Sequence, residues 1–145
     1  MVYTVKDLMY TDFPKTDGQT TVKEAARILK AQDRSFLVIM QEDSPVGIVT
    51  ERDFVRRVIA RDVDPNKTKI TEIMSIPLVT LDPDADLSEA VEMMKRAGIH
   101  KLPIVKEKKL YGVITSRLLT RHFNEYVDRV TREIIRHASF AHFSL

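Results

Sequence analysis

The 145-residue sequence contains no cysteine. This absence excludes a disulfide framework, a thiol nucleophile and any zinc or iron–sulfur site built from thiolates. Only four glycines are present, and the sequence holds no Walker loop, no Gly-x-Gly-x-x-Gly and no Gly-x-Ser-x-Gly. None of the four histidines has a second ligand at a metal-binding spacing such as His-x-x-x-His. We therefore expect a protein that is not an enzyme and that requires neither a metal nor a cofactor.

The sequence also lacks long apolar runs and a strong net charge. The longest unbroken apolar run, Phe36–Met40, is far too short to cross a membrane. Residues 1–9 carry Lys6 and Asp7 and lack the apolar core of a signal peptide. The 23 Lys and Arg residues are balanced by 21 Asp and Glu, and a net charge of +2 gives no general attraction to nucleic acid or to a membrane. We expect a cytoplasmic protein with no membrane partner.

The most informative feature that is present is an internal repeat at an offset of 65 residues. No gap is needed between residues 5 and 119. Four pairs of segments match: Val5–Met9 with Ile70–Met74, Val22–Ala26 with Leu87–Val91, Phe36–Met40 with Lys101–Val105, and Gly47–Arg52 with Gly112–Arg117. A lone unit of this size has too little core to be stable, so we expect the two repeats to pack together.

Each repeat has a readable order of strands and helices. Apolar residues at helical spacing predict a helix over 21–30 that begins with a Thr21–Glu24 capping box, and a matching helix that begins at Asp86 and ends at Gly98. Strands are predicted over 37–40, 46–49, 102–105 and 111–114, and second helices begin at Thr50 and Thr115. Residues 79–81 are a further predicted strand, and their counterpart, residues 14–16, is a weaker candidate.

The order predicts an α/β fold of the α+β type, with each repeat arranged β-α-β-β-α. The first repeat takes residues 1–66, the second takes residues 67–120, and a C-terminal amphipathic helix with its tail takes residues 121–145. The polar segment 61–69 joins the repeats.

These motifs resemble a tandem pair of CBS domains, the module named after cystathionine beta-synthase. The resemblance covers residues 4 to about 120 and is carried by Val5–Met9, the Glu-Ala pair, Gly47–Asp53 and Gly98–Val105. It implies two repeats packed through their sheets about a pseudo-twofold axis, with two clefts between them. It also implies a stand-alone module of the prokaryotic or archaeal type that binds AMP, ADP, ATP or S-adenosylmethionine, signals to a partner and forms a flat homodimer.

The first candidate site is the strand-to-helix junction Gly47–Asp53. The N–H groups at a helix N-terminus suit a phosphate, and the Thr50 hydroxyl and Arg52 guanidinium can add donors. Asp53 is an acceptor-only carboxylate, which suits the two hydroxyls of a ribose. The resemblance carries these ligand-binding roles onto Thr50 and Asp53. The same spacing is also a capping box with Asp in place of Glu, and capping is compatible with ligand binding.

The turn 98–103 supplies the second group of candidates. His100 and Lys101 resemble the basic pair that reaches phosphates in the gamma subunit of AMP-activated protein kinase, although an ordinary exposed turn is the alternative. The resemblance places a purine between Ile48, Ile99 and the stretch 76–80. The predicted nucleotide-binding residues are Ile48, Thr50, Arg52, Asp53, Pro77, Thr80, Ile99, His100 and Lys101.

The second repeat departs from this pattern, because Leu118 stands where the first repeat has Asp53. Leucine cannot accept a hydrogen bond from a ribose. The helix-end phosphate site survives in the sequence, and the residues predicted for this weaker cleft are Arg34, Ser35, Thr115, Ser116 and Arg117. We expect one nucleotide site built on Asp53, and a second cleft that is empty, weak or selective for a ligand without a ribose.

The C-terminal helix carries one apolar stripe: Leu119, Phe123, Tyr126, Val127, Val130, Ile134 and Ala138. This stripe packs against its own module or a dimer mate, or docks an effector protein. The tail 140–143 is frayed or anchors to a neighbour. Nucleic-acid binding through the arginines of the helix is a further hypothesis, and the small net charge argues against it.

The sequence therefore predicts a regulatory module that senses AMP, ADP or ATP and signals to a protein partner. Two alternatives stay open: a protein-interaction scaffold whose clefts are vestigial, and a module for another adenosyl ligand such as S-adenosylmethionine.

Overall fold

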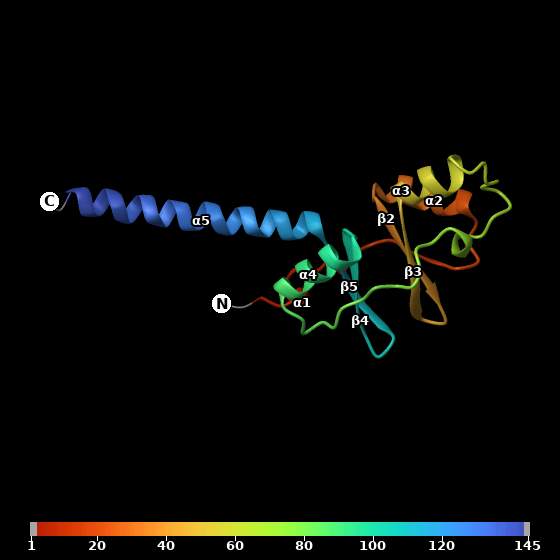
Figure 1. The fold of residues 1–145 in the computed structure, drawn as a ribbon, viewed down its shortest axis with the longest axis horizontal. Helices are drawn as coiled ribbons and strands as arrows, with labels where there is room; N and C mark the ends of the chain where they lie inside the picture. Colours follow the sequence, from red (N-terminus) through yellow and green to blue (C-terminus); the bar gives the residue numbers. More distant parts are fainter. Residues whose placement is uncertain (1–2, 144–145) are drawn as a thin grey trace.

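The computed structural model describes residues 3–143, with side chains through Ala138. The first repeat contains α1 (Val5–Leu8), β1 (Lys15–Asp17), α2 (Val22–Gln32), β2 (Phe36–Gln41), β3 (Ser44–Thr50) and α3 (Glu51–Asp53), which continues as a π-helix over Phe54–Ile59. The second repeat contains a 3-10 turn (Ile70–Glu72), α4 (Leu87–Ala97), β4 (Lys101–Lys106), β5 (Lys109–Thr115) and α5 (Ser116–Phe143). The two repeats lie side by side, and α5 extends away from both (Figure 1).

The two sheets reproduce the sequence repeat in their register. β2 and β3 pair antiparallel with an irregularity between Ile39 and Met40. β4 and β5 pair antiparallel with the same irregularity between Ile104 and Val105, which are the equivalent positions. The expected α+β class and the pair of repeats are therefore confirmed.

One strand prediction was wrong in an informative way. The weaker candidate, near residues 14–16, forms the regular strand β1 parallel to β2, whereas residues 79–81 form only a single bridge between Leu81 and Ile104. Leu81 N–H donates to the Pro103 carbonyl at 3.1 Å and its carbonyl accepts from Val105 N–H at 2.8 Å. The pairing then stops because Pro83 has no N–H to donate.

A short lead-in segment opens each repeat, Val5–Met9 in the first and Ile70–Met74 in the second. Each lead-in packs into the core of the other repeat. Val5 is fully buried in the second core, and its N–H donates to the Ala85 carbonyl at 2.8 Å. Ile70 is fully buried in the first core, and its N–H donates to the Thr20 carbonyl at 2.8 Å. The two repeats thus exchange their lead-in segments, so neither core is complete without the other repeat.

Two strand glycines accommodate this exchange. A Cβ on Gly112 would meet the Met9 side chain and, at 2.6 Å, the Tyr10 carbonyl. A Cβ on Gly47 would meet the Met74 side chain. Glycine at these two equivalent positions therefore lets the lead-in of one repeat lie directly on the strand of the other.

A third cluster joins the two sheets. Phe13, Phe36 and Val38 of the first repeat pack with Val113 of β5. The rings of Phe13 and Phe36 are 6.4 Å apart and stacked. The repeats therefore pack through their sheets as a pseudo-twofold pair.

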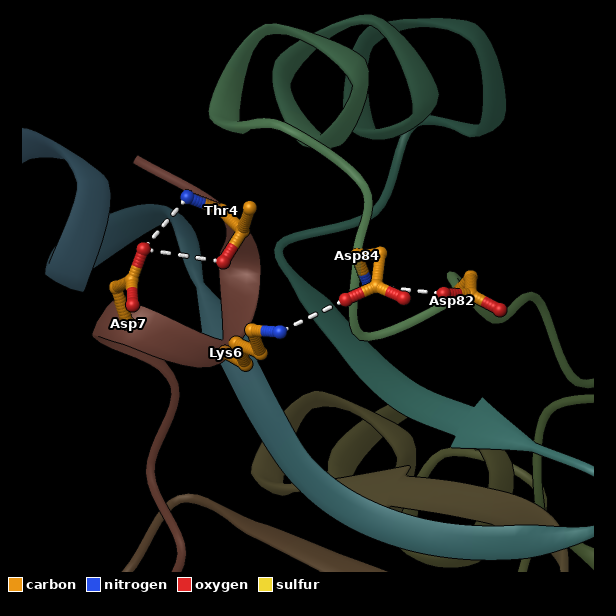
Figure 2. Close-up of polar contacts among 5 residues, drawn as sticks. All are labelled: Thr4, Lys6, Asp7, Asp82 and Asp84. Atoms are coloured by element: carbon orange, nitrogen blue, oxygen red, sulfur yellow. Dashed lines mark hydrogen bonds and ion pairs between the residues drawn. The ribbon is translucent and has the colours of Figure 1, made fainter. Parts of the chain in front are cut away.

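Polar contacts cap α1 and link it to the second repeat through one exposed ion pair (Figure 2). Lys6 Nζ donates to Asp84 Oδ1 at 2.8 Å, while the Thr4 N–H and hydroxyl donate to Asp7 Oδ2. The hydrogen bond and charge of Lys6 hold the pKa of Asp84 below its ordinary 3.8. A carboxyl whose pKa falls on folding stabilises the fold above its ordinary pKa and loses that contribution as the pH falls through the lowered value. Both side chains are exposed, so solvent screens this contribution.

Among its described side chains, through Ala138, the C-terminal helix packs against its own module near its start. Leu119 is half-buried against the second core, and the Tyr3 and His122 rings meet edge-on at 4.8 Å. Farther along, Ile134 is 62% exposed. Packing of the whole stripe against its own module is therefore wrong for the distal part. The expected tail contacts at residues 140–143 lie outside the described side chains. No helix in the described part of the chain is long and apolar enough to cross a membrane.

We predict that Ile70→Ala destabilises the whole protein in one transition, because it opens a cavity in the first core and loosens the second lead-in. The free energy of unfolding should fall by about 2–5 kcal/mol, measured by urea denaturation. Ile59→Ala is the matched control, because Ile59 is 72% exposed and its truncation should change stability by less than about 0.5 kcal/mol. Equal midpoints for the two variants would contradict the exchanged core.

Candidate ligand-binding site

A hollow of about 540 Å³ opens where the end of β3, the start of α3 and the turn before β4 meet. The segment after the second lead-in closes one side. Ser75 N–H donates to the Ile48 carbonyl at 3.1 Å, which pairs this segment with β3. As a result Pro77, Leu78 and Val79 line the same hollow as Asp53.

Asp53 is 9% exposed and faces this hollow. Its Oδ2 accepts the Thr50 N–H at 2.9 Å and lies 3.4 Å from the Thr50 hydroxyl. The capping alternative for Thr50 and Asp53 is therefore present in the structure. Because each carboxylate oxygen has two lone pairs, capping leaves acceptor capacity on Asp53.

Arg57 connects Asp53 to the second lead-in. Its Nη1 donates to the carbonyls of Ile73 and Met74 at 3.2 and 3.1 Å, and its Nε lies 3.5 Å from Asp53 Oδ1. One side chain therefore holds the candidate acceptor beside the second lead-in, just before the residues that line the hollow.

The lining of the hollow is rich in positive charge. Four cationic side chains, Arg52, Arg56, Arg57 and Lys101, face it together with two carboxylates, Glu51 and Asp53, and the imidazole of His100. A concave surface with more cations than anions suits an anionic ligand. Arg–phosphate pairs in such a site form charge-assisted and often bidentate hydrogen bonds.

The structure brings eight of the nine predicted nucleotide-site residues into this hollow: Ile48, Thr50, Arg52, Asp53, Pro77, Ile99, His100 and Lys101. Thr80 does not join them. It lines a separate, open hollow between the two hairpin turns, with Asp17, Gln41 and Lys108. The pairing of Leu81 with β4 directs this part of the chain toward the hairpins.

Two lining arginines, Arg56 and Arg57, were not among the residues predicted from the sequence. They follow Asp53 by three and four residues on one helix, a spacing that puts side chains on the same face. Their helical spacing from Asp53 was therefore the signal that could have placed them at the site.

A second hollow of about 710 Å³ contains all five residues predicted for the weaker cleft: Arg34, Ser35, Thr115, Ser116 and Arg117. Arg34 is partly engaged, since its Nη2 donates to the Asp12 carbonyl at 3.1 Å and its guanidinium lies 5.3 Å from the Tyr10 ring centroid. Leu118 N–H donates to the Thr115 hydroxyl at 3.1 Å. Leu118 thus lies in the first turn of α5 and adds no acceptor carboxylate there.

The two hollows share part of their lining. Ser35, Glu51, His100 and Lys101 line both. The Glu51 N–H donates to the Ser35 carbonyl at 3.0 Å, and the Ser116 N–H donates to the His100 carbonyl at 2.9 Å. The first N–H of α3 and of α5 is therefore already bonded within the protein. An anion at either helix start would have to be bound by other groups, including side chains.

Comparison with known proteins identifies the architecture. The sequence profile of the CBS domain matches this chain twice, over residues 5–60 and 70–125. The chain belongs to the CBS domain family. An uncharacterized protein of Methanopyrus kandleri is 36% identical over 98 residues, which make up 67% of this chain and 50% of that protein. The chain spans half the length of this relative.

Solved structures with the same fold carry different ligands. The CBS domain pair of protein MJ0100, in complex with 5′-methylthioadenosine and S-adenosyl-L-methionine, matches with a TM-score of 0.78 at 26% identity, covering 87% of this chain and 99% of that one. Hypoxic Response Protein I, with two coordinated zinc ions, matches with a TM-score of 0.74 at 26% identity, covering 83% and 98%. Within the described residues of our chain, no three His, Asp or Glu side chains are grouped to hold a metal. This CBS pair is thus a member of a family of regulatory ligand-binding modules.

Proposed function

We propose that this CBS pair senses adenosine nucleotides and passes the occupancy of its Asp53 hollow to an effector protein. One observation carries the proposal: an acceptor carboxylate and four cationic side chains face the same hollow between the repeats. AMP, ADP and ATP combine a ribose diol with phosphates, which is the chemistry that this lining complements. These nucleotides are cytoplasmic metabolites, so we place the module in the cytoplasm.

Each part of the nucleotide has candidate partners in the hollow. Asp53 retains lone pairs for the two ribose hydroxyls while its Oδ2 caps the helix. Arg52, His100 and Lys101 bind phosphate oxygens by charge-assisted hydrogen bonds. Ile48, Ile99 and Pro77 provide an apolar surface for the purine. No catalytic role is proposed for any of these residues.

The charge of the lining favours a nucleotide over S-adenosylmethionine. The sulfonium and ammonium groups of S-adenosylmethionine are positive, and here they would lie among Arg52, Arg56, Arg57 and Lys101. Like charges at close range raise the free energy of the complex, whereas phosphates lower it. We therefore expect AMP or ATP to bind more tightly than S-adenosylmethionine.

Occupancy is signalled through the relative position of the repeats. The hollow is built from both repeats, and Arg57 holds Asp53 and the second lead-in together. A ligand shifts such a pair only if it binds one arrangement better than another. The effector protein then distinguishes the filled arrangement from the empty one.

Asp53→Ala tests the nucleotide site. Calorimetry should give dissociation constants below about 1 mM for AMP and ATP with the natural chain. Loss of the ribose acceptor should raise the dissociation constants of both nucleotides by about tenfold or more. Asp86→Ala is the matched control, because Asp86 caps α4 through Glu89 N–H at 2.9 Å and does not line the hollow. The proposal fails if neither nucleotide binds, and a stable protein partner with empty clefts would then favour a scaffold.

We further propose that the protein is a homodimer in which a second copy covers the exposed stripe of α5. Phe123 and Ile134 are 63% and 62% exposed on this stripe. Near its start the stripe borders an apolar groove of about 440 Å³ that Tyr3, Leu87 and Val91 help to line. The groove and the distal stripe together offer apolar surface that a partner copy can bury.

Ile134→Glu tests this interface by placing a charge on the stripe. Sedimentation equilibrium should show a dimer for the natural chain and at least a tenfold higher dissociation constant for the variant, because the charge would be buried without a partner. Arg132→Glu introduces the same side chain on the opposite face of α5 and should leave the dimer unchanged. A monomeric natural chain, or equal effects of both variants, would contradict the proposed interface.

A further inference from the structure

We propose that a single nucleoside polyphosphate spans both hollows, with its nucleoside at Asp53 and its terminal phosphates in the second hollow. This inference rests on the nucleotide site proposed above and goes further, because it makes the second hollow a phosphate subsite of the first. It therefore assigns one nucleotide, and not two, to each chain.

The two hollows meet at a shared wall. His100, in the turn before β4, and Lys101, the first residue of β4, line both of them, and Ser35 and Glu51 do so from the first repeat. The imidazole Nδ1 of His100 lies 3.3 Å from the Ser116 hydroxyl, at the start of α5. A phosphate chain that begins beside Lys101 in the first hollow therefore reaches the second hollow along groups that can bind it.

The second hollow has donors for phosphates and no acceptor for a ribose from its own helix. Arg117, Ser116 and Lys101 line it, whereas the position equivalent to Asp53 is Leu118. Arg34 adds a further positive charge, although it is partly engaged with the Asp12 carbonyl. Asp33 and Glu51 also line this hollow and reduce its positive charge. The asymmetry between Asp53 and Leu118 thus separates a nucleoside end from a phosphate end.

The shared wall also prevents two nucleotides from binding independently. Lys101 is one cation that serves both hollows. A phosphate bound beside it from one hollow repels a phosphate arriving from the other, because like charges at close range are unfavourable. A polyphosphate avoids this conflict by supplying both groups from the same molecule.

Arg117→Gln separates this inference from the nucleotide site itself. Calorimetry with AMP and ATP should give one equivalent of nucleotide per chain, with ATP bound about tenfold more tightly than AMP. The substitution should raise the dissociation constant of ATP by about tenfold, because a charge-assisted contact to a terminal phosphate is lost. It should change the dissociation constant of AMP by less than about twofold. Arg121→Gln is the control, because Arg121 lies one turn farther along α5 and does not line the second hollow.

The outcomes distinguish the two proposals. One equivalent of ATP whose affinity depends on Arg117 supports the spanning ligand. The spanning ligand is overturned, while the nucleotide site stands, if AMP binds at Asp53 but ATP binds no more tightly and its affinity does not change in Arg117→Gln. Binding of two equivalents of ATP per chain would overturn it in the same way. If neither nucleotide binds, both proposals fail. Circular dichroism of each variant checks that the fold is retained.

Discussion

Two buried aliphatic side chains, Val5 and Ile70, constrain the rest of the structure because each completes the core of the opposite repeat. Their burial places Met9 and Met74, each four residues farther along the chain, against Gly112 and Gly47 of the other repeat. The exchange turns two units, each too small to be stable alone, into one cooperative fold. It also fixes the line along which the repeats meet, and the candidate site lies on that line.

The site follows from this exchange. The second lead-in ends against β3, so the residues after it form one wall, and Arg57 holds the lead-in itself to Asp53. The other wall comes from the turn that begins β4. Because the hollow belongs to neither repeat alone, any ligand that fills it contacts both. This is the physical requirement for a module that reports occupancy through the arrangement of its repeats.

Most of the local structure could be predicted, because it depends on local periodicity and on the 65-residue repeat. The same repeat allowed the grouping of Asp53 with His100 and Lys101 through a family resemblance. The exchange of lead-ins could not be predicted, since an apolar residue such as Val5 does not specify which of two similar cores it enters. The position of Thr80 depends on the Leu81 bridge to β4, a long-range contact with no local signal. The sequence also left open what covers the distal stripe of α5, because an amphipathic pattern does not identify its partner.

A crystal structure of the protein soaked with AMP would test the central claim, that the junction of the exchanged repeats is an adenosine-nucleotide site. We expect the ribose hydroxyls within hydrogen-bond distance of the Asp53 carboxylate and the phosphate among Arg52, His100 and Lys101. An empty Asp53 hollow at saturating AMP, or a nucleotide bound only elsewhere on the molecule, would contradict the account.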